Sequence, residues 1–426
     1  MDRNDSTYQS YLRILQEELV PATGCTEPIS IAYGAAKARS VLGELPARAV
    51  LTVSGNILKN VKSVVVPGTG GLKGIQAAAA AGIVAGDAEA ELQVVAHITA
   101  ADRVGIEKFL LETPIEVKCA QTPIVFDILI ELFTESDAHS ARLRITNSHK
   151  NIVFIQKDDD VLLDLPVSAS SEAGLADKTL LNLRDIVEFA DTVEIGDIEP
   201  LMDRWVSCNS AISEEGLKND WGAGIGKLLL ASGATDLRTK ARAAAAAGSD
   251  ARMSGCEMPV VILSGSGNQG LTASMPVLTY AKEMGADKEK LYRALTVSAL
   301  VTAEQKAGIG RLSAYCGATS AGVGAGAGVA YLHGAKSEKI EEVVKNAVAM
   351  LSGMVCDGAK PSCAAKIAGA VDAGLMGYEM SERGRNFQGG DGFLSEGADK
   401  TIENVGRMAR SMRETDETIL QIMTES

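Results

Sequence analysis

Three cysteines near the C-terminal end place the strongest constraint on how this chain can fold. Cys316, Cys356 and Cys363 follow the spacing Cys-x39-Cys-x6-Cys. Thiolates that converge in a reducing compartment usually hold a metal, because thiolate is a soft anionic ligand. Three protein thiolates would leave one position open on a zinc ion or an iron–sulfur cluster, where a substrate can bind. The spacing alone leaves a second interpretation equally open, in which the three are small buried hydrophobes.

The composition predicts a core built from small side chains. Aromatic residues make up only 4% of the 426 residues, whereas glycine occurs 43 times. The core must therefore be filled by Ala, Val, Leu and Ile, with backbones close together. A chain of this length is expected to form two or three domains. The uncharged run 312–335 is long enough to span a bilayer, but its Gly, Ser and Thr content predicts a buried helical segment instead.

Charge and the first residues limit the partners and the compartment. The net charge of −14 argues against nucleic acid, whose phosphates need a basic surface. Residues 1–10 contain no apolar signal core, and seven cysteines is an odd count for a disulfide framework. We therefore expect a cytoplasmic protein that binds neither nucleic acid nor a membrane. The oligomeric state stays open, with a homodimer as one arrangement.

The hydrophobic periodicity predicts an α+β fold, in which a smaller α+β domain is inserted into a mainly helical catalytic domain. Residues 1–89 would form the N-terminal part of the catalytic domain, residues 90–175 the inserted domain, and residues 176–426 the helical, metal-binding part. A polar linker at 168–177 would separate the last two. Strands are expected at 49–53, 63–66, 92–98, 115–119, 124–133, 141–146 and 151–156.

Cys25 lies in a second cysteine motif, Gly24-Cys-Thr-Glu-Pro28, at the predicted start of a helix. Thr26 can cap that helix, and Pro28 suits its first turn. The helix dipole would then stabilise a Cys25 thiolate and lower the pKa of the thiol. The alternative is a buried thiol beside a turn.

Glycine-rich loops follow two predicted strands and recur before a later helix. They are Ser54-Gly-Asn-Ile-Leu-Lys-Asn60, Pro67-Gly-Thr-Gly-Gly71 and Ser264-Gly-Ser-Gly-Asn-Gln-Gly270. Backbone N–H groups in such loops can hold an anion, and Lys59 could add positive charge. The alternative is that they are ordinary turns. Gly-Cys-x-x-Pro and Ser-Gly-Asn each occur twice in the chain, which points to an internal pseudo-repeat.

The sequence argues against two common chemistries. No G-x-S-x-G is present and only four histidines occur, so a Ser-His-Asp hydrolase is not supported. Gly265-Ser-Gly-Asn-Gln-Gly270 matches a dinucleotide-binding pattern, but Met275-Pro276 limits the helix that would receive the pyrophosphate.

Taken together, the motifs identify a known family. To those already quoted, the chain adds Ser254-Gly-Cys256, Leu312-Ser-Ala-Tyr-Cys316-Gly and Cys356-Asp-Gly-Ala-Lys-Pro-Ser-Cys363. The chain resembles the L-cysteine desulfidase family, a group related to the serine dehydratase α domain. This resemblance implies an oxygen-sensitive [4Fe–4S] enzyme that converts L-cysteine and water to pyruvate, ammonia and hydrogen sulfide. It also implies that Cys316, Cys356 and Cys363 are the cluster ligands and that Cys25 is catalytic.

The resemblance and the chemistry together define a candidate site. The α proton needs a base or acid, for which Cys25, Lys59 and His97 are candidates in falling order. The glycine loops offer a substrate-binding set, namely Ser54, Asn56, Asn60, Thr69, Ser266 and Asn268.

Three alternatives stay open. L-serine could be the substrate, although the x6 gap departs from the longer one of iron–sulfur serine dehydratases. The protein could instead be a non-catalytic metal-binding sensor of cysteine or sulfide. Cys25 could close the cluster at rest and step aside when cysteine arrives.

Overall fold

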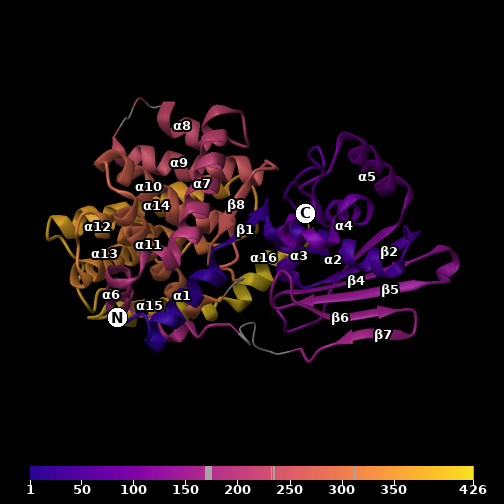
Figure 1. Cartoon of the computed structure of the whole chain (residues 1–426), viewed down its shortest axis with the longest axis horizontal. Helices are drawn as coiled ribbons and strands as arrows, with labels where there is room; N and C mark the ends of the chain where they lie inside the picture. Colours follow the sequence, from indigo (N-terminus) through magenta and orange to yellow (C-terminus); the bar gives the residue numbers. More distant parts are fainter. Residues whose placement is uncertain (168–174, 232, 234–235, 311–312, 426) are drawn as a thin grey trace.

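The computed structural model has two parts, a bundle of helices and a sheet covered by helices, which lie side by side in Figure 1. It describes residues 1–167, 175–231, 233, 236–310 and 313–425. The predicted α+β class is confirmed, because helices predominate and most strands gather in one part. Most of the expected polar linker, residues 168–174, lies outside the described residues.

Six strands form the sheet in the order β3-β2-β4-β5-β6-β7. β2 and β3 run parallel, and each other neighbouring pair is antiparallel. The strands are β2 (Arg48–Val53), β3 (Ile115–Cys119), β4 (Asp127–Phe133), β5 (Ser140–Thr146), β6 (Ile152–Lys157) and β7 (Asp160–Asp164). The strands predicted at 49–53 and 115–119 and the hairpin that begins at 141 are confirmed.

Helices cover one face of this sheet because side chains alternate along its strands. In β5, Leu143 and Ile145 are buried, whereas Arg142 is exposed. α2 packs on β4 and β5, α4 packs on α2, and α5 packs on α4. The helices of this part are α2 (Thr26–Leu42), α3 (Gly55–Val61), α4 (Gly74–Ala85) and α5 (Ala100–Glu112).

Two strands expected from the sequence are wrong. Residues 92–98 form the end of the 3₁₀ helix η1 (Ala88–Gln93) and a turn. The N–H of Asp87 bonds to the carbonyl of Val94 at 2.9 Å, which closes this segment on itself and removes it from sheet pairing. Residues 63–66 make only a single bridge to the segment before α4.

The sheet part begins well before residue 90, where the sequence placed a domain boundary. β2 lies between β3 and β4, and α2 and α4 share one hydrophobic core with the strands. Residues between 22 and 155 therefore surround a common core, and 1–89 is not separate from 90–175. α1 (Ser6–Glu18) instead packs with the helices that follow residue 176.

The helical part is built around α12, which contacts α10, α11, α13 and α14. Its helices are α6 (Leu183–Thr192), α7 (Ile195–Lys218), α8 (Ile225–Ala231), α9 (Leu237–Met253), α10 (Gly267–Met284), α11 (Lys288–Ile309), α12 (Gly317–Leu332), α13 (Ser337–Met350), α14 (Cys363–Glu382) and α15 (Ala398–Arg410). The described part of the uncharged run 312–335 contains α12, which is buried as predicted. None of the helices in the described ranges has the length and apolar character needed to cross a bilayer.

Small residues bring the backbones of α12 and α14 into contact. A Cβ placed on Gly322 would lie 2.2 Å from the carbonyl oxygen of Ala370. One on Gly326 would lie 2.3 Å from the carbonyl oxygen of Gly374. Atoms cannot approach this closely, so glycine is required at both positions. Close packing of backbones, which the composition predicted, is therefore found at Gly322 and Gly326.

We expect Gly326→Ala to destabilise the protein by about 1–3 kcal/mol, because the added methyl must push α12 and α14 apart. Gly369→Ala is the matched control on α14, since a Cβ there meets nothing within 4 Å. That change should be neutral or raise stability by up to about 1 kcal/mol through helix propensity. Urea unfolding of both variants measures the difference, and equal stabilities would contradict close contact between these helices.

Two short elements join the parts. β1 (Val20–Thr23) pairs antiparallel with β8 (Pro259–Ile262), so the loop that follows β1 lies beside the segment that precedes β8. α16 (Arg413–Glu425) leaves the helical part and ends beside α3, as Figure 1 shows. Of the pseudo-repeat, only Ser-Gly-Asn recurs in the same setting, because Ser54 and Ser266 each precede the first residue of a helix that follows a strand.

Candidate active site

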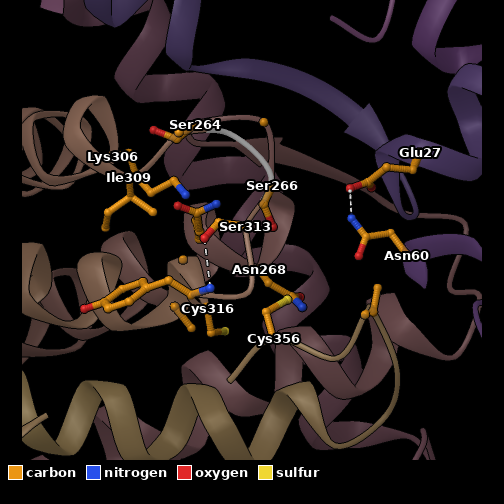
Figure 2. A pocket seen from close by; sticks show the side chains of 18 of the residues that line it. Glu27, Asn60, Ser264, Ser266, Asn268, Lys306, Ile309, Ser313, Cys316 and Cys356 are labelled. Atoms are coloured by element: carbon orange, nitrogen blue, oxygen red, sulfur yellow. Dashed lines mark hydrogen bonds between the residues drawn. The ribbon is translucent and has the colours of Figure 1, made fainter. Parts of the chain in front are cut away.

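A cavity of about 320 Å³ lies where the two parts meet. Its walls come from the starts of α2, α10, α12 and α14, the end of α11 and a loop of the sheet part at 123–126. The residues on these walls that can donate, accept or ligate include Cys25, Glu27, Asn60, Arg252, Ser264, Ser266, Asn268, Gln269, Lys306, Cys316, Cys356, Cys363 and Lys366. Several are labelled in Figure 2.

The structure brings the three C-terminal cysteines to this cavity. Cys316 directly precedes α12, and Cys363 is the first residue of α14. A short antiparallel bridge pairs Tyr315 with Val355, the residues before the two cysteines, and in it the Cys316 N–H bonds to the Met354 carbonyl at 2.8 Å and the Cys356 N–H to the Ala314 carbonyl at 2.7 Å. Backbone pairing therefore holds two of the three thiols side by side, although 39 residues separate them.

The surroundings of these thiols favour negative charge at Cys356. The hydrogen bond from the Cys316 thiol lowers the pKa of Cys356, and the charges of Lys59 and Lys366 lower it further against the effect of burial. The same hydrogen bond raises the pKa of Cys316, as does burial. Burial raises the pKa of the Cys363 thiol. The site is thus prepared to hold at least one thiolate.

Cys119 and Cys208 lie elsewhere. Cys119 is exposed at the end of β3, and Cys208 is half-buried on α7. Neither lines the cavity. Within the described ranges, no three His, Cys, Asp or Glu side chains are placed as ligands of a single metal ion.

Cys25 reaches the same cavity from the N-terminal side. It directly precedes α2 and forms a small apolar cluster with Val64 and Met253, against which Cys363 packs. The N-terminal motif therefore meets the C-terminal cysteines, as the sequence predicted. Its capping chemistry differs, because Thr26 is already the first residue of the helix and Cys25 occupies the cap position.

The expected low pKa of Cys25 is wrong. Its side chain is only 2% exposed, and burial raises the pKa of the thiol well above its ordinary value. The negative charge of Glu27 raises it further, whereas Arg252 opposes the shift. Desolvation can move a pKa by several units, whereas a helix terminus contributes only about 0.3–2 kcal/mol. Cys25 is therefore a protonated donor.

Glu27 accepts the hydrogen bond that the Cys25 thiol donates. The Cys25 thiol donates to Oε2 of Glu27 at 3.3 Å, and Nδ2 of Asn60 donates to Oε1 at 3.1 Å. Figure 2 shows the Glu27–Asn60 pair apart from Cys316 and Cys356. The carboxylate is held at both oxygens and has a thiol to exchange a proton with.

The other predicted residues divide into three groups. Asn60, Ser266 and Asn268 line the cavity. Ser54 and Asn56 line a neighbouring hollow of about 690 Å³ beneath α16, which shares the loop 123–125 with the first.

The remaining three are not brought to the cavity walls. Thr69 uses its hydroxyl to donate to the Val66 carbonyl at 2.7 Å. His97 is exposed on the turn after η1. Lys59 is buried and forms an ion pair with Asp416 of α16.

Sequence reasoning missed Glu27, Arg252 and Gln269 as cavity residues. Glu27 stands inside the quoted motif Gly24-Cys-Thr-Glu-Pro28, so its acidic side chain next to a catalytic candidate was an available signal. Arg252 is a charged residue at the end of an alanine-rich helix, and nothing in the local pattern distinguishes it from a solvated one.

Comparison with known proteins identifies the family of this chain. The family model for the serine dehydratase alpha chain matches residues 89–421, which include all three C-terminal cysteines. The chain belongs to the serine dehydratase alpha chain family. Cys25, Glu27 and Asn60 precede the matched residues of this family.

Relatives extend over both parts of the chain. A UPF0597 protein of Desulfitobacterium hafniense is 54% identical over 99% of this chain and 98% of its own. UPF0597 proteins of Finegoldia magna and Treponema denticola are 46% and 43% identical, over 98% and 99% of this chain and 100% and 99% of their own. The matched stretch therefore covers nearly the whole chain, including the part before residue 89.

Proposed function

We propose that this protein is a lyase that eliminates hydrogen sulfide from L-cysteine with a [4Fe–4S] cluster, leaving pyruvate and ammonia. The observation that carries the proposal is the meeting of three cysteines with the Cys25–Glu27 pair in one cavity. The elimination needs both parts, a soft metal centre for the leaving sulfur and a group that exchanges the α proton.

The residues present fit such a cluster. Cys316, Cys356 and Cys363 would hold it, and each cysteine of such a centre binds a separate iron. The positive charges of Lys59 and Lys366 near Cys356 suit an anionic centre. When bound, the cluster supplies a Lewis-acidic iron without a protein ligand, which favours departure of a thiolate.

The chain's own groups supply the proton chemistry. Glu27 can accept the α proton of the substrate, while the Cys25 thiol, which keeps its proton and is hydrogen-bonded to the same carboxylate, can donate that proton to the leaving sulfur and regain one from Glu27. The Cα–H and Cβ–S bonds break, a Cα=Cβ bond forms, and the sulfur leaves with a proton as hydrogen sulfide. Aminoacrylate then reacts with water to give pyruvate and ammonia. Asn60 keeps Glu27 in position during the exchange.

L-serine is the second candidate substrate, because the matching family model is that of the serine dehydratase alpha chain. Its elimination would use the same groups, with water as the leaving molecule. The thiolate ligand set suits either substrate, and the x6 gap between Cys356 and Cys363 favours L-cysteine.

Anaerobically reconstituted protein should convert L-cysteine to equal amounts of pyruvate and sulfide, with a higher kcat/KM than for L-serine. Lactate dehydrogenase coupling measures pyruvate, and a colorimetric assay measures sulfide. Pyruvate from L-serine alone would establish the second candidate. Binding of L-cysteine without either product would overturn both and indicate a sensor.

A further inference from the structure

One buried charge in the cavity is not used by the proton chemistry. Arg252, in the last turn of α9, is 2% exposed and lines the cavity. Its Nε donates to the Gly24 carbonyl at 3.0 Å, and its Nη1 lies 4.0 Å from the Met253 sulfur. Across the described residues, no carboxylate forms an ion pair with this guanidinium. A buried charge without a counter-ion is costly and marks a place for an anionic ligand.

Other buried cations of the chain show the contrast. Lys59 pairs with Asp416, and Lys178 pairs with Glu18 at 2.7 Å. Arg252 is instead held by the backbone carbonyl of Gly24, in the loop after β1, and it packs against the first residue of α10. A Cβ placed on Gly267 would lie 2.4 Å from Arg252 Nε, so glycine at this position makes room for the guanidinium.

A second polar side chain on the cavity walls, that of Gln269, has an acceptor oxygen without a hydrogen-bond donor in the described ranges. Gln269 is 5% exposed, and its Oε1 accepts no hydrogen bond from any described residue. Its amide lies against Gly317, where a Cβ would be 2.5 Å from the Gln269 Cδ. Gly317 directly follows Cys316, so this acceptor lies beside the proposed cluster ligands.

We propose that Arg252 binds the α-carboxylate of the substrate and that Oε1 of Gln269 accepts a hydrogen bond from its α-ammonium group. Guanidinium matches a carboxylate through two parallel N–H donors. This inference rests on the proposed function in that it places an α-amino acid in the same cavity. It adds that recognition requires the carboxylate, and that the site selects α-amino acids over simple thiols.

The test compares Arg252→Gln and Arg252→Lys with the unchanged holoenzyme. The KM for L-cysteine should rise about 10- to 100-fold in Arg252→Gln, because a hydrogen bond to a charged partner is lost, whereas kcat should change less. Arg252→Lys should lie between the two, since it keeps the charge without the paired donors. Inhibition by cysteamine, which has the thiol and amine but no carboxylate, should be the same in all three.

Binding of L-alanine provides a readout that does not need turnover. It carries the carboxylate and ammonium without a leaving group, and calorimetry should detect its binding to unchanged protein and about 10- to 100-fold weaker binding to Arg252→Gln. This binding measurement is informative even if no pyruvate forms from any substrate. A failure of carboxylate binding by Arg252 can therefore be distinguished from a failure of the proposed function. Gln269→Leu should weaken L-alanine binding by about 5- to 10-fold.

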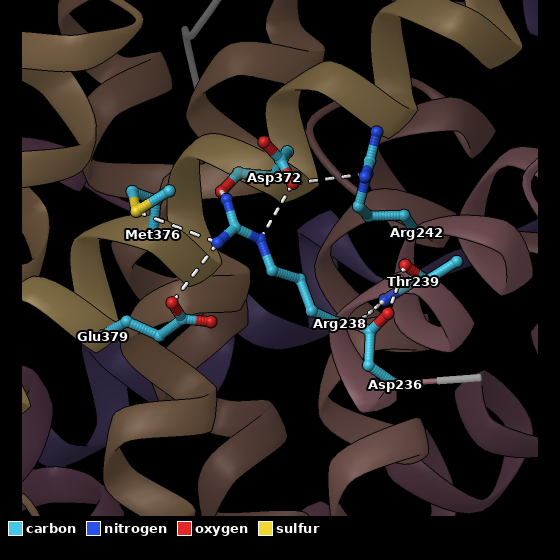
Figure 3. Close-up of polar contacts among 7 residues, drawn as sticks. All are labelled: Asp236, Arg238, Thr239, Arg242, Asp372, Met376 and Glu379. Atoms are coloured by element: carbon cyan, nitrogen blue, oxygen red, sulfur yellow. Dashed lines mark hydrogen bonds and ion pairs between the residues drawn. The ribbon is translucent and has the colours of Figure 1, made fainter. Parts of the chain in front are cut away.

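Arg238→Gln is the matched control, because Arg238 lies on the same helix and away from the cavity. Its guanidinium pairs with Asp372 at 2.8 Å and Glu379 at 3.3 Å, as Figure 3 shows. This variant should lose some stability and keep the KM. Circular dichroism and cluster absorption establish that each variant is folded. Unchanged KM and L-alanine affinity in both folded Arg252 variants, or an equal loss of cysteamine binding, would overturn the proposal.

Discussion

Replacing Cys356 by alanine should remove the iron–sulfur absorption of anaerobically reconstituted protein and reduce pyruvate formation to background. Cys356 lines the cavity with the other two thiols, and the hydrogen bond from the Cys316 thiol and the positive charges of Lys59 and Lys366 near it favour a thiolate and lower its pKa. Because only three cysteines would hold the cluster, removing one leaves a second iron without a protein ligand and destabilises the whole cluster. The effect should therefore exceed the loss of about 100- to 10,000-fold typical of an acid–base group. Visible spectra and iron analysis, near four irons per chain before the change, measure it.

Cys316→Ala and Cys363→Ala should behave in the same way, because both thiols line the same cavity. Cys119→Ala and Cys208→Ala are the controls and should keep both iron and activity, since one thiol is exposed on β3 and the other lies on α7. Loss of iron in Cys119→Ala alone would show that the ligand assignment is wrong.

The parts of this fold that sequence predicted are those in which neighbours along the chain decide the outcome. β5 buries alternate side chains, and β6 pairs with it antiparallel after a short turn. The glycine content of α12 predicts that another helix can pack closely against it, but it does not predict that this helix is α14. The type of an element and how closely another helix can approach it are thus set by the local sequence. Which element packs against it is not.

Long-range pairing explains what sequence could not predict. β2 looks the same whether it belongs to a separate N-terminal domain or, as found, sits between β3 and β4. His97 lies in a segment with strand-like alternation that a backbone bond from Asp87 closes into a turn. Arg252 meets the Gly24 carbonyl across 228 residues of sequence, and no local pattern reports that contact.

Cys25 shows a different limit, in which sequence identified the residue but not the stronger of two opposing effects. Its position at a helix start predicts stabilisation of a thiolate, and that position is confirmed. The extent of its burial depends on Val64 and Met253, which belong to segments that sequence could not place against it. Because desolvation outweighs the helix terminus here, the thiol keeps its proton and donates a hydrogen bond to its neighbour Glu27.

That neighbour defines the last prediction. Cys25→Ser should keep the cluster spectrum and lose about 100- to 10,000-fold of pyruvate formation, because serine holds its proton too tightly to exchange it. Glu27→Gln should lose a similar factor, since an amide can neither accept the α proton nor return a proton to the thiol across the 3.3 Å hydrogen bond. Steady-state rates at saturating L-cysteine measure both.

The two variants together separate three roles for Cys25. Loss in both assigns proton exchange to the pair, with the sulfur facing the substrate. Loss in Glu27→Gln with full activity in Cys25→Ser would mean that the carboxylate acts without the thiol and that Cys25 is structural. A spectrum of substrate-free Cys25→Ser that differs from that of the unchanged protein would mean that Cys25 closes the cluster at rest. Its buried position against Cys363 argues for the first role, because a donor already bound to Glu27 has a proton path that a resting ligand does not need.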